Sequence, residues 1–187
     1  MADKISKRLV IDASVARSAG GEESTYPTSV HCREFLIAVL NICHKIVMTD
    51  DIKNEWNRHK SAFSRKWLIQ MYSKKKVHYL NISIDDNLWK QVESIAASIS
   101  NKRIEEMTKD LCLIEAANAT DRIVVSLDDN TARKFFGEAS ARIDELKNIV
   151  WVNPDKVEAE QPIAWLKDGA VVESDRLLAN YQNERIG

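Results

Sequence analysis

Two short aliphatic runs, each followed at once by an aspartate, constrain the fold of this chain more than any other feature of its sequence. Residues 8–11 lead into Asp12, and residues 122–127 lead into Asp128. Short runs rich in valine and isoleucine are typical of strands that are buried on both faces, as in parallel sheets. Since helical patterns separate the runs, we predict an α/β fold with three layers, α/β/α, around a mostly parallel central sheet.

Length and composition are those of an ordinary globular domain. The chain has 187 residues and a net charge of −1, so any contact with nucleic acid has to come from a local basic patch. No apolar run approaches the roughly 18–20 residues of a membrane span, and the first residues do not resemble a secretory signal, so we expect no membrane partner. The three cysteines have no C-x-x-C spacing, which favours a reducing compartment and predicts a cytoplasmic protein.

The pattern along the chain predicts two parts. Residues 1–153 contain the alternating strands and helices, and residues 154–187 form a helical extension that packs on the same domain or on a partner. Gly137 is expected to end a short helix, because glycine favours the position just after a helix. Pro154 is expected to begin the first helix of the extension, since proline suits the first helical turn. Strands are expected at residues 7–12, 44–48, 77–84, 123–127 and 148–152.

Asp12 and Asp128 are expected to meet at one edge of the sheet. Ligands of open α/β sheets bind beyond the carboxyl ends of the strands, where both residues stand. Two carboxylates from distant segments predict a site for a hard cation there, and the Ser14 hydroxyl can share it. The alternative is local structure, in which Asp12 and Ser14 form an ordinary turn. Asp128 or Asp129 then only caps the next helix.

Asp110 lies in the middle of an apolar helix face. At 100° per residue, Ile114 and Ala117 flank it on the same side of the helix. A carboxylate on a buried face is costly, so it requires a cation or strong hydrogen bonds. An ion pair with Arg103 on the same helix is the alternative. Glu55, in the first two turns of another predicted helix, is by itself no more than a solvated acid favoured by the helix dipole.

Four short motifs resemble those of the PIN-domain nuclease family. Residues 9–14, Leu-Val-Ile-Asp-Ala-Ser, resemble its opening strand, and residues 110–117 resemble its helix with an acid followed by Ile, one residue and Ala. Residues 126–128, Ser-Leu-Asp, are similar to its Thr-x-Asp strand end. Residues 49–56 are similar to the segment that contains the family's glutamate, here Glu55. The order and spacing of the four motifs make the resemblance more specific than any one of them.

The resemblance covers about residues 7–153 and implies Mg²⁺- or Mn²⁺-dependent hydrolysis of RNA. It implies that Asp12 and Asp110 are the strongest metal ligands and that Asp128 binds directly or through water. Glu55 then positions a metal or the attacking water. The catalytic set is therefore Asp12, Glu55, Asp110 and Asp128, with Ser14 and Asp129 as supporting groups.

The same resemblance implies partners. If the chain is a toxin, as some members of the family are, the resemblance implies an antitoxin protein. Members of the family often form homodimers, so a homodimer is implied as well. The chain departs from compact toxins in its larger 57–103 region, its 154–187 tail, and Glu115, which stands where the family has a small residue. The main rival is a non-catalytic PIN-like module that binds RNA or protein. An aspartate-nucleophile phosphatase is disfavoured, because Ser14 occupies the position of its second Asp.

A basic stretch next to Glu55 predicts where RNA binds. Eight basic residues and a single acid lie between Lys53 and Lys76, with Trp56, Trp67 and Tyr72 interleaved. Basic groups with aromatics suit a single-stranded backbone and its bases. The alternative is a solvated helix face with Trp67 in the core. The predicted nucleic-acid contacts are Arg58, Lys60, Arg65, Lys66, Lys74, Lys75 and Lys76.

Overall fold

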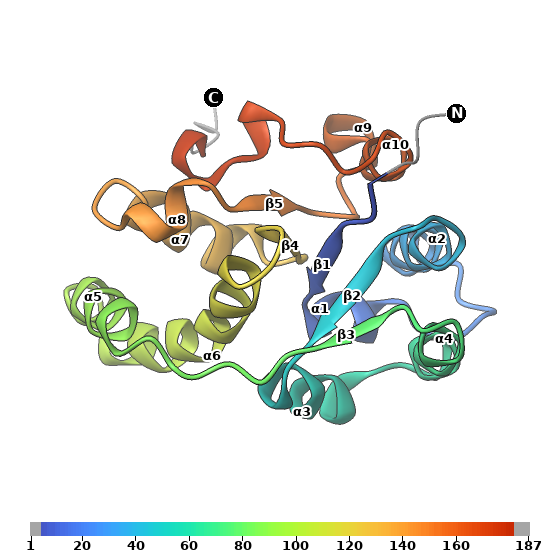
Figure 1. The fold of residues 1–187 in the computed structure, drawn as a ribbon, viewed down its shortest axis with the longest axis horizontal. Helices are drawn as coiled ribbons and strands as arrows, with labels where there is room; N and C mark the ends of the chain where they lie inside the picture. The colour runs from blue at the N-terminus through green and yellow to red at the C-terminus, as the bar shows by residue number, and fades with distance from the viewer. Residues whose placement is uncertain (1–4, 182–187) are drawn as a thin grey trace.

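Five short parallel strands form one sheet in the computed structural model, which describes residues 5–181 (Figure 1). The strand order is β3-β2-β1-β4-β5, and all four pairings between neighbouring strands are parallel. Helices lie on both sides of the sheet, so the predicted three-layer α/β/α fold is confirmed. The strands are β1 (Arg8–Ile11), β2 (Lys45–Met48), β3 (Val77–Tyr79), β4 (Ile123–Val125) and β5 (Val150–Val152).

The strands are shorter than their sequence patterns predict. The clearest case is β3, which ends at Tyr79 although the strand pattern continues to residue 84. Leu80 still donates its N–H to the carbonyl of Met48 at 2.8 Å, and the chain then leaves the sheet. β3 is an edge strand, and its one neighbour, β2, ends at Met48, which is the partner of Tyr79, so β2 offers no further strand residue to pair with.

Four helices of the main domain begin after a polar side chain that caps them. Thr49, Ser61, Asp85 and Ser100 each accept a backbone N–H from the first turn of the helix that follows. Helices α2 and α4 lie on one side of the sheet, and α5 and α6 on the other (Figure 1). The elements are α1 (Ala13–Ser18), α2 (Pro27–Asn41), α3 (Asp50–His59), α4 (Ala62–Ser73), α5 (Asp86–Ala97), α6 (Asn101–Asn118), the π-helical turn η1 (Asp129–Arg133), α7 (Lys134–Ala139) and α8 (Asp144–Lys147).

Gly137 does not end a helix, and this prediction is wrong. Helix α7 continues through Gly137 to Ala139. A methyl group at Gly137 would lie 2.7 Å from Cβ of Tyr181, which packs on this side of the helix. Glycine is therefore required here for the close approach of the C-terminal segment, and not for a left-handed turn.

Pro154 does not begin a helix either. The side chain of Asn153 accepts the N–H of Asp155 at 2.9 Å, and this bond holds residues 153–156 in a turn. Helix α9 (Val157–Glu160) follows, and the proline at a first helical position is instead Pro162 in α10 (Pro162–Lys167).

The C-terminal segment folds back onto the main domain. Helix α10 packs on α2, and the 3₁₀ turns η2 (Ser174–Arg176) and η3 (Leu178–Asn180) contact β5 and α7. The prediction of an extension to residue 187 lies partly outside the described residues. No helix within residues 5–181 is long and apolar enough to cross a lipid bilayer.

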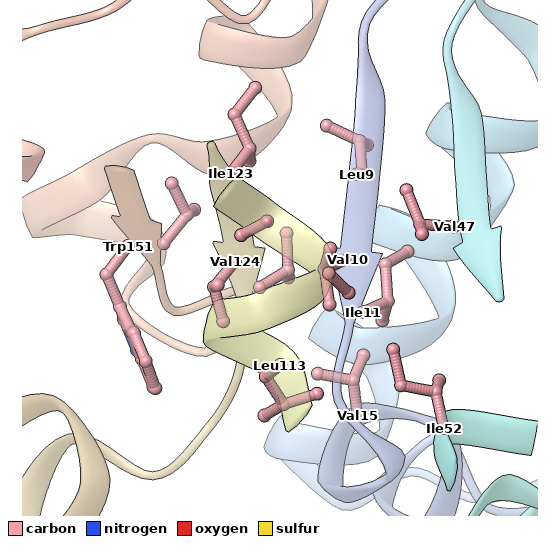
Figure 2. Close-up of a cluster of buried hydrophobic side chains, with 14 of the residues drawn as sticks. Leu9, Val10, Ile11, Val15, Val47, Ile52, Leu113, Ile123, Val124 and Trp151 are labelled. Atoms are coloured by element: carbon pink, nitrogen blue, oxygen red, sulfur yellow. The ribbon is translucent and has the colours of Figure 1, made fainter. Parts of the chain in front are cut away.

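The core fixes α3 and α6 against the end of β1. Val10 and Ile11 of β1 lie among buried side chains from several elements, including Ile52 of α3 and Leu113 of α6 (Figure 2). Trp56 of α3 is 1% exposed, and its indole N–H donates to the carbonyl of Ile11 at 2.8 Å. This bond ties the helix that contains Glu55 to the strand that leads into Asp12.

Replacing Trp56 with phenylalanine tests that anchor. We expect Trp56→Phe to lower the free energy of unfolding by at least about 2 kcal/mol, because it removes a buried hydrogen bond and leaves unfilled volume. Tyr72→Phe, at an exposed ring on α4, is the control and should change little. Equal unfolding midpoints in urea for Trp56→Phe and wild type would contradict this role.

Candidate functional site

Asp12 and Asp128 follow neighbouring parallel strands, as the sequence predicts. The N–H of Asp12 donates to the carbonyl of Val125 at 2.9 Å, which continues the ladder between β1 and β4. Two hydroxyl groups then hold one oxygen of Asp12, Oδ2. Ser14 donates to it at 2.5 Å and Ser126 at 2.8 Å. Hydrogen bonds to one carboxylate oxygen leave the other, Oδ1, available for a ligand.

Asp128 is held on both sides. Its N–H donates to Oγ of Ser126 at 3.1 Å, and its Oδ1 accepts the N–H of Thr131 at 2.9 Å. The second bond is the helix cap that the sequence offers as the alternative role, and it caps the π-helical turn η1. The cap uses only one of the two carboxylate oxygens, Oδ1.

A small cavity opens between the end of β1 and the helices α3 and α6. Its volume is about 90 Å³, and three of the four predicted catalytic acids, Asp12, Glu55 and Asp110, line it. A buried water needs roughly 10–15 Å³ of such volume, so the cavity can hold a hydrated ion. Its lining residues are Asp12, Ala13, Ile52, Glu55, Trp56, Lys109, Asp110, Cys112 and Leu113.

Asp110 is the most perturbed acid of this cavity. Burial, and after it the charges of Asp12, Asp128 and Glu106, raise its pKa to about 8, while Lys109 opposes the shift. Within residues 5–181, the Asp110 carboxylate has no hydrogen bond or ion pair. Arg103, its alternative partner, pairs with Glu106 at 3.1 Å instead. A half-buried, unpaired carboxylate among like charges favours the binding of a proton or a cation.

Glu55 lines the same cavity but has partners of its own. Its Oε1 accepts a hydrogen bond from Arg58 at 2.9 Å, and its Oε2 lies 3.5 Å from Nε2 of His59. Both partners are exposed and lie on the same helix, so these contacts are weak and can be exchanged for water or a ligand.

The acidic side chains of residues 5–181 do not form a complete set of ligands for one metal ion. Among residues 5–181, no three His, Cys, Asp or Glu side chains are gathered closely enough to ligate one ion together. Mg²⁺, however, keeps most of its waters and usually takes one or two carboxylates directly. Asp12 and Asp110, which line one cavity large enough for water, fit that smaller requirement.

The structure removes Asp129 from the acidic site. The sequence predicts it as a supporting group, but its side chain is buried among cationic and amide groups. Its Oδ1 lies 3.1 Å from Arg133, and its Oδ2 lies 2.7 Å from the amide of Asn153 and 3.2 Å from Lys156. Both oxygens of Asp129 are therefore engaged in contacts that stabilise the fold around η1.

The structure also removes Lys76 from the predicted RNA surface. Lys76 is 9% exposed, and its ammonium donates to the carbonyls of Val39, Leu40 and Ile42 at 2.5, 2.9 and 2.5 Å. These are carbonyls at the C-terminal end of α2, where a lysine satisfies unpaired acceptors. Burial, more than the nearby charge of Lys74, lowers the pKa of Lys76.

The aromatic residues of the basic stretch are mostly core residues. Trp56 and Trp67 are each 1% exposed and stack on each other with ring centroids 5.9 Å apart, so they do not offer faces to bases. Tyr72 remains exposed. The other six predicted contacts keep accessible side chains, although three of them already have polar partners, since Arg58 bonds Glu55, Lys60 bonds Asn57 and Lys66 bonds Glu22.

Sequence analysis missed two residues of the site. Ser126 belongs to the Ser-Leu-Asp motif, but only the parallel pairing of β1 and β4 reveals that its hydroxyl bonds Asp12. Lys109 lines the cavity beside Asp110, and nothing in the helical pattern distinguishes it from a solvated lysine. The unusual Glu115 has a local explanation, because its Oε1 accepts the N–H of Asp85 and so joins α6 to the start of α5.

No protein-family model matches the chain, and no curated protein matches its sequence. The resemblance to PIN-domain nucleases therefore rests on the four short motifs, and the chemistry of the site has to be argued from its geometry.

The pKa of Asp110 predicts a pH dependence of stability. An acid with a higher pKa in the folded protein than its ordinary value of 3.8 stabilises the fold while protonated. The metal-free protein should therefore lose stability as the pH rises from about 4 to about 8. Asp110→Asn should remove this loss, so at pH 8.5 its free energy of unfolding should exceed that of wild type by on the order of a few kcal/mol. Its unfolding temperature at that pH should therefore be higher.

The measurement is the unfolding temperature of both proteins in EDTA between pH 4.5 and 9. Glu158→Gln, at an exposed acid of α9, is the control and should keep the wild-type profile. Parallel profiles for wild type and Asp110→Asn would contradict a raised pKa at Asp110.

Proposed function

We propose that this protein is a Mg²⁺- or Mn²⁺-dependent ribonuclease of the PIN type, which hydrolyses phosphodiester bonds of RNA at the cavity beyond β1 and β4. The observation that supports it best is the Asp110 carboxylate, which is half-buried, unpaired within residues 5–181, and close to the charges of Asp12 and Asp128. Such an arrangement is destabilising unless a proton or a cation binds, and functional sites are where such groups accumulate.

The residues of the cavity have distinct roles in this proposal. Asp12 and Asp110 are the direct cation ligands. Ser14 and Ser126 keep the Asp12 carboxylate in place through Oδ2, as hydrogen bonds to the ligand side chains do around many metal sites. A bound divalent cation supplies an activated water and neutralises charge on the scissile phosphate.

Asp128 and Glu55 complete the site from its two sides. Asp128 lies outside the cavity lining, so it adds negative charge from the end of β4 and binds through water. Glu55 gives up its exposed contacts with Arg58 and His59 and orients the attacking water. Both roles require only the exchange of weak surface contacts or a bridging water.

Accessible basic residues of α3, the helix that contains Glu55, and of the following helix α4 support RNA as the substrate. Lys74 and Lys75 directly precede β3 and therefore lie at the edge of the sheet opposite to Asp12 and Asp128, so the residues of α3 and of the start of α4 carry this argument. Phosphates attract such groups regardless of base sequence, and the exposed ring of Tyr72 is suited to stacking. The six accessible basic residues are Arg58, Lys60, Arg65, Lys66, Lys74 and Lys75.

A non-catalytic module that binds RNA or protein is the second candidate. It is favoured by one observation, which is that no three ligands are gathered around one point within residues 5–181. An antitoxin partner, a toxin role and a homodimer stay predictions of the resemblance.

Cleavage of a mixed-sequence single-stranded RNA with Mn²⁺ or Mg²⁺ tests the proposal. Wild type should cut, and Asp12→Asn and Asp110→Asn should each lower the rate by at least about 100-fold, because each removes a cation ligand. Asp144→Asn should cut at the wild-type rate. Circular dichroism has to show that the variants are folded.

Two outcomes would contradict the proposal. Cleavage that persists in EDTA, or at the wild-type rate in both Asp12→Asn and Asp110→Asn, would point to a contaminating nuclease. Metal-dependent RNA binding without cleavage, lost in Asp12→Asn, would favour the binding module.

A further inference from the structure

A buried cluster of charged and amide side chains joins the C-terminal segment to the end of β4. We call it the charge network and define it by Asp129, Arg133, Asn153, Glu160 and Arg176. Asp129, Arg133, Asn153 and Arg176 are each less than 9% exposed, and the side chain of Glu160 is 11% exposed. Charged groups are rarely buried without a specific partner, so each member depends on the others.

Arg133 is the centre of the charge network. Its Nη1 donates to Asp129 at 3.1 Å and to Glu160 at 2.5 Å, and its Nη2 donates to the carbonyl of Trp151 at 3.1 Å. A guanidinium holds such a fork of acceptors in fixed directions. Arg133 thereby joins η1, strand β5 and helix α9.

Glu160 connects this centre to the C-terminal segment. Its Oε2 accepts the N–H of Asn153 at 2.9 Å and lies 3.5 Å from Nη1 of Arg176. Arg176 also donates to the backbone carbonyl of Glu160 and stacks over the ring of Trp165, 5.4 Å from its centroid. The last turns of the chain therefore fix the carboxylate that neutralises Arg133.

The charge network and the acidic site are joined through the π-helical turn η1, which directly follows Asp128. Arg133 is the last residue of η1, and its backbone N–H donates to the carbonyl of Asp128 at 3.0 Å. The amide of Asn153 bonds Asp129 at 2.7 Å at the other end of the same turn. A π-helical turn is rare and needs such outside support, and turns of this kind are frequent at functional sites.

We propose that Glu160, Arg133 and Arg176 are positioning residues of the acidic site, which hold η1 so that Asp128 faces Asp12 and Asp110. The C-terminal segment is then a structural part of the cation site, although none of its residues lines the cavity. This inference rests on the proposed function, because it assumes that the acids bind a divalent cation.

The test is the affinity for Mn²⁺ itself, measured from the signal of free Mn²⁺ in electron paramagnetic resonance at a temperature where every variant is folded. Glu160→Gln keeps the shape of the side chain but leaves Arg133 and Arg176 under-neutralised. We expect it to weaken Mn²⁺ binding by about tenfold, the size typical of changes outside the direct ligands. Lys156→Gln, at the half-exposed lysine that pairs with Asp129, should weaken binding by about two- to threefold and remains usable if Glu160→Gln does not fold.

Two controls separate positioning from general destabilisation. Arg8→Gln breaks the ion pair with Asp121 at the opposite edge of the sheet, and it should lower the unfolding temperature without changing Mn²⁺ affinity. Glu158→Gln, at an exposed residue of α9, should change neither quantity.

The measurements distinguish the failure of the positioning role from the failure of the metal site itself. Wild-type Mn²⁺ affinity in folded Glu160→Gln and Lys156→Gln would overturn the positioning role and leave the metal site intact. The same loss of affinity in Arg8→Gln would also overturn it, because the effect would then be general. If wild type binds no Mn²⁺, both the metal site and its positioning residues are refuted.

Discussion

Repulsion among the carboxylates of Asp12, Asp110 and Asp128 is the constraint on which the rest of this structure depends. Asp110 is brought to them on a helix that is otherwise packed against β1 and β4, so it cannot turn to solvent without disturbing the core. The free energy that this costs is recovered when a proton or a cation binds. A fold that keeps such a cluster sacrifices stability in the metal-free state.

Much of the surrounding structure serves to hold the carboxylates together. The parallel pairing of β1 and β4 brings two strand ends to the same edge, and the hydroxyls of Ser14 and Ser126 fix one oxygen of Asp12. Trp56 ties α3 to β1 from one side. From the other side, the charge network ties η1 to the C-terminal segment. Elements from nearly the whole length of the chain therefore help to hold the acids in place, although only residues between Asp12 and Leu113 line the cavity itself.

The fold and the acids were predictable because they depend on local patterns. Short buried runs separated by capped helices define a parallel sheet, and the topology then places Asp12 and Asp128 side by side. Asp110 was predictable from helical periodicity, since a carboxylate in an apolar arc is unusual.

The wrong predictions have a common physical cause. In each case, contacts between segments that are distant in the sequence determine the role of the residue. Lys76 belongs to a run of three lysines, and only the end of α2, more than 30 residues earlier, explains why it is buried. The sequence around Gly137 is typical of a helix end, but Tyr181 packs so closely on Gly137 that a side chain there would clash with it. Asp129 stands next to Asp128 in the sequence, yet its carboxylate accepts hydrogen bonds from Arg133 and Asn153.

The central claim is that the cavity between Asp12 and Asp110 is a site for a divalent cation. A crystal of the wild-type protein soaked in Mn²⁺, with diffraction data collected at the manganese absorption edge, tests it most directly. We expect an anomalous peak in the cavity within coordination distance of one or both carboxylates, and no such peak in Asp110→Asn crystals. A cavity without manganese in wild-type crystals at saturating Mn²⁺ would contradict the claim.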